Sequence, residues 1–317
     1  MIKIIFTDFK FVKSFIKNFF LLLFWHFKYK KNLNIICLTE HIGDIVACEP
    51  VTRHLLSKNI HAKNIWITYE KYLDLVKYNP NIYTTSTVTC ISEWAILKHL
   101  LKSKLNIYDL HISRECPKYG FAIINSNEIN YNNYLSHLNL LESFSASAGI
   151  TDLNIKSSQF YINKNKLQKN LDFDSDYVII HTKSNYSKKD WDINNWKWIV
   201  TYNSKIRFIE VGLEPIFDKN SAPQNYISYC KELNFIEIAH LIKNSKLYMG
   251  IDSGFAHIAN CFEVPKIILM GDFNHFKQYN PFNLSYKNSL HLVNKETNIQ
   301  LINEYVLNLR KNVESIE

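Results

Sequence analysis

Short apolar runs alternate with amphipathic runs along most of this chain. Between residues 34 and 148 the apolar runs have the length of strands, and the runs between them repeat apolar positions every three or four residues. The predicted strands span 34–38, 64–68, 83–88 and 108–112, and the predicted helices span 44–57, 69–76, 92–102 and 134–148. Strands separated by helices of this length predict a parallel sheet with helices on both faces.

The alternation resumes after residues 151–175, which are rich in Asn, Lys, Ser and Asp and are interpreted as a linker. The second block comprises predicted strands at 177–181, 206–211, 247–251 and 266–270 and predicted helices at 194–202, 235–243, 255–262 and 298–311. The whole pattern predicts an α/β protein with two doubly wound, Rossmann-like domains, 32–165 and 166–297. A ligand cleft is expected between them at the carboxyl ends of the strands. Residues 298–317 are expected to form a C-terminal helix that can pack back on the first domain.

Residues 1–31 do not follow the alternation. They contain seven lysines and a single acidic residue, and their longest apolar run, Phe19–Trp25, is too short to span a bilayer. On a helical wheel one side is apolar and the opposite side carries Lys13 and Lys17; the apolar residues are Phe11, Phe15, Phe19 and Leu22. This pattern predicts a basic amphipathic helix lying on an anionic membrane surface. The alternative is a terminal helix packed on the protein's own core.

Composition narrows the classes of function. The 317 residues include 37 basic and 29 acidic side chains, and all but four of the basic residues are lysines. Lysine is a poorer reader of base edges than arginine, so the charge favours a phosphorylated substrate or an anionic surface over sequence-specific nucleic-acid binding. The six cysteines have no metal-ligand spacing, and Asp172-Phe173-Asp174 is interpreted as linker acids, so no metal is expected. The sequence contains neither GxGxxG nor GxxxxGK[ST], which disfavours a nicotinamide dehydrogenase and a P-loop enzyme.

Three predicted strand-to-helix turns carry candidate chemistry. The turn Asp252-Ser253-Gly254 can aim backbone N–H groups at a phosphate, although Asp252 or Ser253 could simply cap the next helix. At Gly43-Asp44, the glycine permits a tight turn and the aspartate can be a general base or an N-cap. The third turn, from Thr182 to Trp191, offers hydroxyls and lysines to a diphosphate, or is an ordinary solvated loop.

Together these segments resemble glycosyltransferase family 9, the heptosyltransferase-type enzymes with the two-domain GT-B fold. Asp252-Ser253-Gly254-Phe255-Ala256-His257 is similar to that family's DTG-x-x-H motif, with serine in place of threonine. Gly43-Asp44 followed by Pro50 is similar to its G-D-x-x-x-x-x-P turn, and Lys189-Asp190-Trp191 to its K-x-W segment. The family's G-P-T appears here as Gly271-Asp272-Phe273, a departure that sets an acid beside the expected phosphate site.

The resemblance implies an inverting glycosyltransferase that uses a nucleotide-sugar donor, needs no metal or other cofactor, and acts on a lipid-linked or cell-surface glycan such as lipopolysaccharide core. It implies that Asp44 is the general base. It also implies that Lys189 and the N–H groups of Ser253 and Gly254 bind the donor phosphates. Asp252 is then expected to bind sugar hydroxyls, His257 to support the donor site, and Glu214 to contact the ribose. Thr182 belongs to the same expected donor site, and Gly43 and Gly271 are its expected backbone turns. The protein is expected in the cytoplasm, peripherally bound to the inner face of the membrane through residues 1–31, with no nucleic-acid partner. The alternatives are a GT-B-like sugar-nucleotide epimerase or hydrolase, and a non-catalytic family member that scaffolds other enzymes.

Overall fold

The chain folds into two compact units, residues 1–161 and 162–317, as seen in a computed structural model. The structure describes residues 8–115, 122–136, 139–155, 157–169, 171, 173, 176–270, 289–293 and 299–314. Gly271, Asp272, Asp172 and Asp174, which the sequence singled out, lie outside the described residues, as do residues 1–7. Within the described part, no helix is both long enough and apolar enough to cross a membrane.

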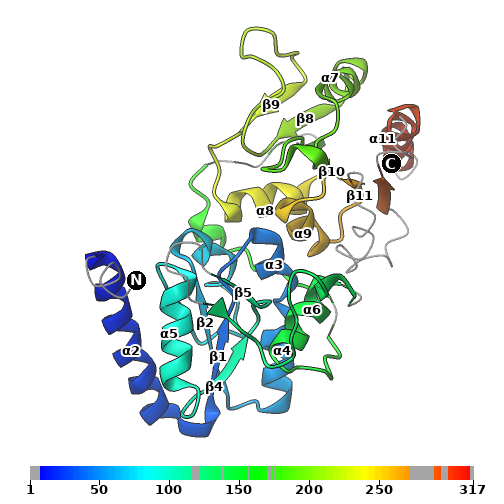
Figure 1. Ribbon diagram of the computed structural model, residues 1–317. Coiled ribbons are helices and arrows are strands. Elements are labelled where there is room, and N and C mark those ends of the chain that lie inside the picture. Colours follow the sequence, from blue (N-terminus) through cyan, green and yellow to red (C-terminus); the bar gives the residue numbers. More distant parts are fainter. Residues whose placement is uncertain are drawn as a thin grey trace. The chain divides into compact units, whose positions relative to one another are not determined.

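The first unit is built on a parallel sheet with the strand order β3-β2-β1-β4. The strands are β1 (Leu33–Cys37), β2 (Lys63–Thr68), β3 (Thr84–Thr87) and β4 (Asn106–Asp109). Helices α2 (Phe9–Tyr29) and α5 (Ile91–Leu101) lie on one side of this sheet, and α3 (Ile42–Ala47), α4 (Pro50–Lys58) and α6 (Leu140–Ser147) lie on the other (Figure 1). Alternate strand residues point to opposite faces, so Ile35 and Ile65 pack under α2 and α5, where Trp94 and Leu97 complete a buried core. A two-stranded antiparallel ribbon, β5 (Arg114–Glu115) with β6 (Ala122–Ile123), was not predicted.

Three predicted helices of this unit differ from the prediction. The helix expected at 44–57 is two helices, because Pro50 lacks an N–H to continue α3 and instead opens α4 at its first turn. The helix expected at 134–148 starts at Leu140, where the Asn139 side chain accepts the Glu142 N–H as an N-cap. The segment expected as helix 69–76 is the 3₁₀ turn Glu70–Leu75.

The second unit is a parallel six-stranded sheet with the order β12-β11-β10-β7-β8-β9. Its strands are β7 (Tyr177–His181), β8 (Arg207–Glu210), β9 (Tyr226–Ser228), β10 (Leu247–Ile251), β11 (Lys266–Met270) and β12 (Ser289–Val293). Helices α7 (Ile193–Tyr202) and α11 (Ile299–Glu314) cover one face through Trp196, Ile199 and Ile302, while α8 (Phe235–Asn244) and α9 (Gly254–Asn260) belong to the other layer (Figure 1). The three strands β7, β10 and β11 match the predicted ranges, whereas β9 and β12 were not predicted because neither segment has a clear apolar run.

Both sheets share one winding. In the first sheet the strands lie in the order β3-β2-β1-β4, and in the second sheet β9-β8-β7-β10 lie in the corresponding order. In each sheet the chain first adds strands on one side and then crosses to the other side. The direction of winding therefore reverses between β1 and β4 in the first sheet and between β7 and β10 in the second. In open α/β sheets ligands bind at this switch point, outside the carboxyl ends of the two strands. The topology therefore directs attention to the residues that follow β1 and β4 in the first unit, and β7 and β10 in the second.

Candidate active site

The switch point of the second unit holds an ion pair. The Lys189 Nζ lies 2.8 Å from the Asp252 Oδ2. Asp252 follows β10 and is 2% exposed, and Lys189 ends the 3₁₀ turn Ser187–Lys189 after β7 with 22% of its side chain exposed. A buried carboxylate needs such a partner. The structure thus brings together two of the residues expected at the donor site, and it shows that Asp252 is not simply a helix cap.

Helix α9 begins directly after Asp252. Ser253 is its N-cap by backbone conformation, but its side chain accepts no bond from the helix backbone, and Gly254 is the first helical residue. The backbone N–H of Asp252 is already used by β11, donating to the Leu269 carbonyl at 2.9 Å. His257 lies buried on the same helix, one turn after Ser253. The predicted group Asp252, Ser253, Gly254 and His257 is therefore one local unit, assembled by the end of β10 and the start of α9.

Thr182 lies in a different environment from the one expected of a donor contact. Its hydroxyl is buried and donates to the Glu210 Oε1 at 2.5 Å. Glu210 also accepts the Ile216 N–H at 2.9 Å and the Tyr226 hydroxyl. Burial raises the pKa of Glu210 above its ordinary value, and these hydrogen bonds oppose the rise. Since the hydroxyl hydrogen serves this internal network, we leave Thr182 out of the donor contacts.

Two further groups lie at the same edge of the second sheet. His181 ends β7, its Nδ1 is 2.9 Å from the Val211 carbonyl, and its ring packs on Phe255 with centroids 4.6 Å apart. Burial lowers the pKa of His181 to about 4, so the ring is neutral at pH 7 and Nδ1–H donates to the carbonyl. Glu214 is exposed and pairs with the Lys183 Nζ at 2.6 Å. Nothing in the sequence singles out His181, because it ends an apolar strand and no pattern marks its contacts.

Asp44 lies in the first turn of α3, after β1. Its carboxylate Oδ2 is 3.2 Å from the Nδ1 of His41, and 18% of its side chain is exposed. The tight turn predicted at Gly43 occurs instead at His41, which has a φ of 39°, while Gly43 is a buried helical residue. A left-handed conformation is uncommon for a residue with a side chain and is frequent at functional turns. Sequence reasoning selected Asp44 as a candidate and missed the histidine beside it.

A buried polar chain links the ends of β1 and β4. The Asp109 Oδ1 lies 2.6 Å from the His111 Nδ1, and the His111 Nε2 accepts the backbone N–H of Thr39 at 3.0 Å. Lys98 donates to the other oxygen of Asp109 at 2.7 Å. A backbone N–H can only donate, so the ring is unprotonated at Nε2 and carries its proton on Nδ1, facing Asp109. Although burial raises the pKa of Asp109, His111 and Lys98 lower it further, to about 2.

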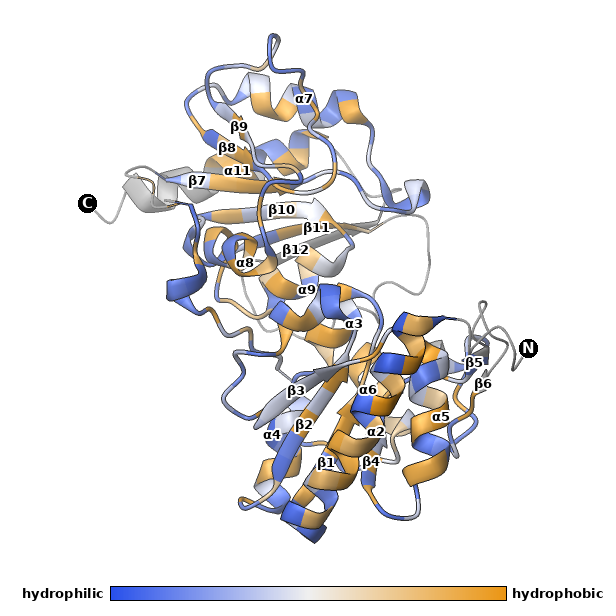
Figure 2. Cartoon of the chain, turned by 90° about the vertical axis from the view of Figure 1, so that its left-hand side faces the viewer, coloured by the Kyte–Doolittle hydropathy of each residue, from blue (hydrophilic) through white to orange (hydrophobic). Residues whose placement is uncertain are grey.

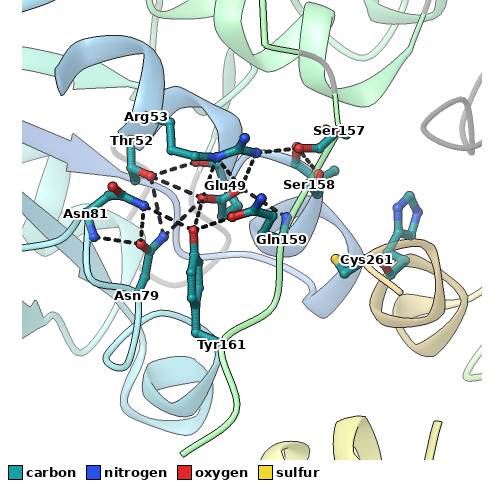
Figure 3. A network of polar contacts seen from close by, with 12 residues as sticks. Glu49, Thr52, Arg53, Asn79, Asn81, Ser157, Ser158, Gln159, Tyr161 and Cys261 are labelled. Carbon is teal, nitrogen blue, oxygen red and sulfur yellow. Dashed lines mark hydrogen bonds and ion pairs between the residues drawn. The ribbon is translucent and has the colours of Figure 1, made fainter. Parts of the chain in front are cut away.

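Glu49, at the bend between α3 and α4, gathers a second network (Figure 3). It pairs with Arg53 at 2.7 Å and accepts the Gln159 N–H at 3.0 Å and the Tyr161 hydroxyl at 3.2 Å. Ser158 reaches the same bend, donating to the Ala47 carbonyl at 3.1 Å. The last residues of the first unit, 157–161, are therefore fastened to the helix pair that carries Asp44.

In the second unit, Glu237 holds the connecting chain as Glu49 does in the first. Its side chain closes a capping box with Asn234 at the start of α8, and its Oε1 also accepts the backbone N–H groups of Gln168 and Lys169 at 3.0 and 3.2 Å. The chain is thus attached to the second unit by residue 168.

Among the described residues, no group of three or more His, Cys, Asp or Glu side chains is arranged to hold a metal ion.

Comparison with solved structures identifies the fold. A glycosyl transferase family 9 protein from Veillonella parvula is similar over 84% of this chain and 87% of its own, with 15% identity and a TM-score of 0.60. E. coli ADP-heptose lps heptosyltransferase II is similar over 89% and 99%, with 12% identity and a TM-score of 0.61. The iron-containing dodecameric glycosyltransferase TibC from enterotoxigenic E. coli is similar over 79% of this chain, with 15% identity and a TM-score of 0.54; this chain spans 61% of it. No curated protein sequence matches significantly. The two Rossmann-like units, with an additional N-terminal helix, form a GT-B fold.

The family model for glycosyltransferase family 9 (heptosyltransferase) matches residues 122–302, more than half of the chain. The protein belongs to this family and is a glycosyltransferase. The resemblance drawn from the three turns is therefore confirmed, and the matched range contains both Lys189 and Asp252.

Proposed function

We propose that this enzyme transfers a heptose or related hexose from a nucleoside-diphosphate sugar to a hydroxyl of a lipid-linked or cell-surface glycan, such as lipopolysaccharide core. The proposed reaction takes place at the cytoplasmic face of the membrane. The observation that carries the proposal is the Lys189–Asp252 pair at the switch point between β7 and β10. A partly exposed cation held against a buried acid suits a ligand with both a diphosphate and hydroxyl groups. A nucleotide donor is also supported by the structural similarity to E. coli ADP-heptose lps heptosyltransferase II.

In this proposal Asp44 acts on the acceptor. Its carboxylate takes the proton of the attacking hydroxyl as the oxygen forms a bond to the anomeric carbon. The bond from that carbon to the diphosphate breaks, and its electron pair leaves with the nucleoside diphosphate. Attack opposite to the leaving group inverts the anomeric centre.

The donor contacts come from the second unit. Lys189 offsets the negative charge that grows on the leaving diphosphate, with the N–H groups of Ser253 and Gly254 as further donors. Asp252 accepts hydrogen bonds from sugar hydroxyls, His257 supports the start of α9, and Glu214 contacts the ribose. Lysine supplies the charge that a divalent ion supplies in metal-dependent transferases, so we propose that no metal is required.

The experiment is a product analysis with purified protein, a panel of nucleoside-diphosphate sugars and lipid-linked acceptors. Wild type should release nucleoside diphosphate only with acceptor present, and Asp44→Asn should lower kcat on the order of a hundredfold or more with little change in donor affinity. Asp74→Asn, on the surface of the same unit, is the matched control. Free sugar or an epimer formed without acceptor would identify a hydrolase or epimerase instead. Because a solved neighbour is iron-containing, each rate is measured with and without EDTA, and an EDTA-sensitive rate would refute metal independence.

A further inference from the structure

The outward side of α2 presents a stripe of large apolar side chains to solvent. Its members are Phe9 (79% exposed), Ile16 (49%), Phe20 (65%), Phe24 (56%) and Phe27 (72%). Positions separated by four, seven and eleven residues share one helix face, so these side chains form a continuous row about five turns long. Figure 2, which shows the molecule from the side on which α2 lies, displays apolar positions along the helix between hydrophilic ones. We call this row the outer face of α2.

The outer face is not the one that the sequence suggested for a membrane. Of the expected stripe, Phe11 and Leu22 are buried with Trp25 in the core of the first unit, against α5. Asn18 fixes the same inner side, because its amide donates to the buried Glu93 carboxylate at 2.8 Å and accepts the Ser86 hydroxyl at 2.7 Å. Turning the helix would expose this core and leave a buried carboxylate short of a donor, so the outer face stays outward.

Basic side chains border the outer face. Lys13 and Lys17 are exposed and lie two turns before Phe20 and Phe24, and the Lys28 ammonium lies 5.6 Å from the Phe24 ring centroid. Three further exposed lysines complete the border: Lys10, Lys30 and Lys31. Between residues 8 and 31 the only acidic side chain is Asp8, and it caps the helix by accepting the Phe11 N–H. A row of aromatic side chains with lysines beside it is complementary to an anionic phospholipid surface, whose headgroups attract lysine and whose interface accepts aromatic rings.

We propose that the outer face of α2 docks this protein on the surface of an anionic phospholipid bilayer. The helix lies parallel to the surface, its phenylalanines enter the headgroup region, and the lysines contact lipid phosphates. The docking is compatible with the proposed acceptor, which is lipid-linked, but it involves neither donor nor turnover. Vesicle binding and sugar transfer can therefore succeed or fail independently.

The test is co-sedimentation of the full chain with vesicles of phosphatidylcholine alone or with phosphatidylglycerol added. Phe20→Ser/Phe24→Ser/Phe27→Ser should weaken binding to the anionic vesicles at least tenfold. Lys13→Gln/Lys17→Gln should weaken it about thirtyfold, from roughly 1 kcal/mol for each lysine near the surface. Ile60→Ser removes a 76% exposed apolar side chain of the same unit and should leave binding unchanged. Circular dichroism confirms that each variant is folded.

Wild-type binding that weakens at high salt and is negligible on neutral vesicles supports the proposal. Equal binding by wild type and the triple phenylalanine variant overturns it, as does equal binding to neutral and anionic vesicles. Light scattering without vesicles tests the other occupant, a second copy of the chain. A dimer that the triple variant abolishes, together with no vesicle binding by wild type, would show that the outer face is a protein interface.

Discussion

The Asp109–His111–Lys98 cluster predicts a stability that depends on pH. Asp109 is buried, and its carboxylate is held by the His111 Nδ1 at 2.6 Å and the Lys98 Nζ at 2.7 Å. The folded protein lowers the pKa of Asp109 from 3.8 to about 2. At 1.36 kcal/mol per pKa unit, this difference corresponds to roughly 2 kcal/mol of folding stability at pH 7.

The sign follows from the lowered pKa. Stability from a carboxylate whose folded pKa is depressed is fully present above the unfolded value near 3.8 and is lost as the pH falls through about 2. At pH 3 roughly half of it remains, about 1 kcal/mol. Asp109→Asn keeps the shape of the side chain but cannot carry the charge. The variant should therefore be less stable than wild type by about 2 kcal/mol at pH 7 and by about half as much at pH 3.

The measurement must report on the first unit alone, because two units need not unfold together. Urea titration followed by fluorine NMR of 5-fluorotryptophan does this, since Trp66 and Trp94 are buried in that unit. Asp74→Asn is the control, because the Asp74–Lys77 pair is partly exposed and should contribute less than about 1 kcal/mol at either pH. An Asp109→Asn deficit that is equal at pH 7 and pH 3, or no larger than that of Asp74→Asn, would refute the reasoning.

Two further predictions concern the buried acids Asp252 and Glu49. Lys189→Met leaves the 2% exposed Asp252 carboxylate without its cation, so it should destabilise the second unit by about 3–5 kcal/mol and weaken donor binding. Lys189→Met/Asp252→Asn should restore most of the thermal stability but not the donor affinity, and a single variant as stable as wild type would contradict the role of the pair. Glu49→Gln removes the charge that holds Arg53 and should cost about 2–3 kcal/mol. Hydrogen exchange of residues 157–161 should then quicken, while the exposed Glu70→Gln leaves it unchanged; unaltered exchange in Glu49→Gln would count against the network.

The sequence predicted the fold well where apolar runs are strong and well bounded. Buried parallel strands such as β7, β10 and β11 read as continuous apolar runs, so their limits were predicted to the residue. The helix limits were less accurate because they depend on local contacts: Asn139 begins α6, and Pro50 separates α3 from α4. The short strand β9 has no comparable signal, since its place is decided by pairing with β8.

The candidate site was predictable where chemistry is local in sequence. Asp44, Asp252 and the start of α9 stand at strand-to-helix turns, which a linear reading can find. The partner of Thr182 was not predicted, because Glu210 lies on the neighbouring strand. Sequence also could not choose between the two apolar sides of α2, since the choice is made by contacts with Glu93, more than seventy positions away. What escaped prediction at Thr182 and on α2 is a pairing between distant segments.

The attachments of the connecting chain determine where the protein can flex. Residues up to Tyr161 are held to the first unit through Glu49, and Gln168 and Lys169 are held to the second through Glu237. A change in orientation between the units must then be absorbed by the φ and ψ angles of residues 162–167, which include the 3₁₀ turn Lys164–Lys166. Residues 162–167 are therefore a six-residue hinge between the segment that Glu49 holds and the segment that Glu237 holds, and the two residues proposed as acceptor base and donor cation, Asp44 and Lys189, lie on opposite sides of it in the chain.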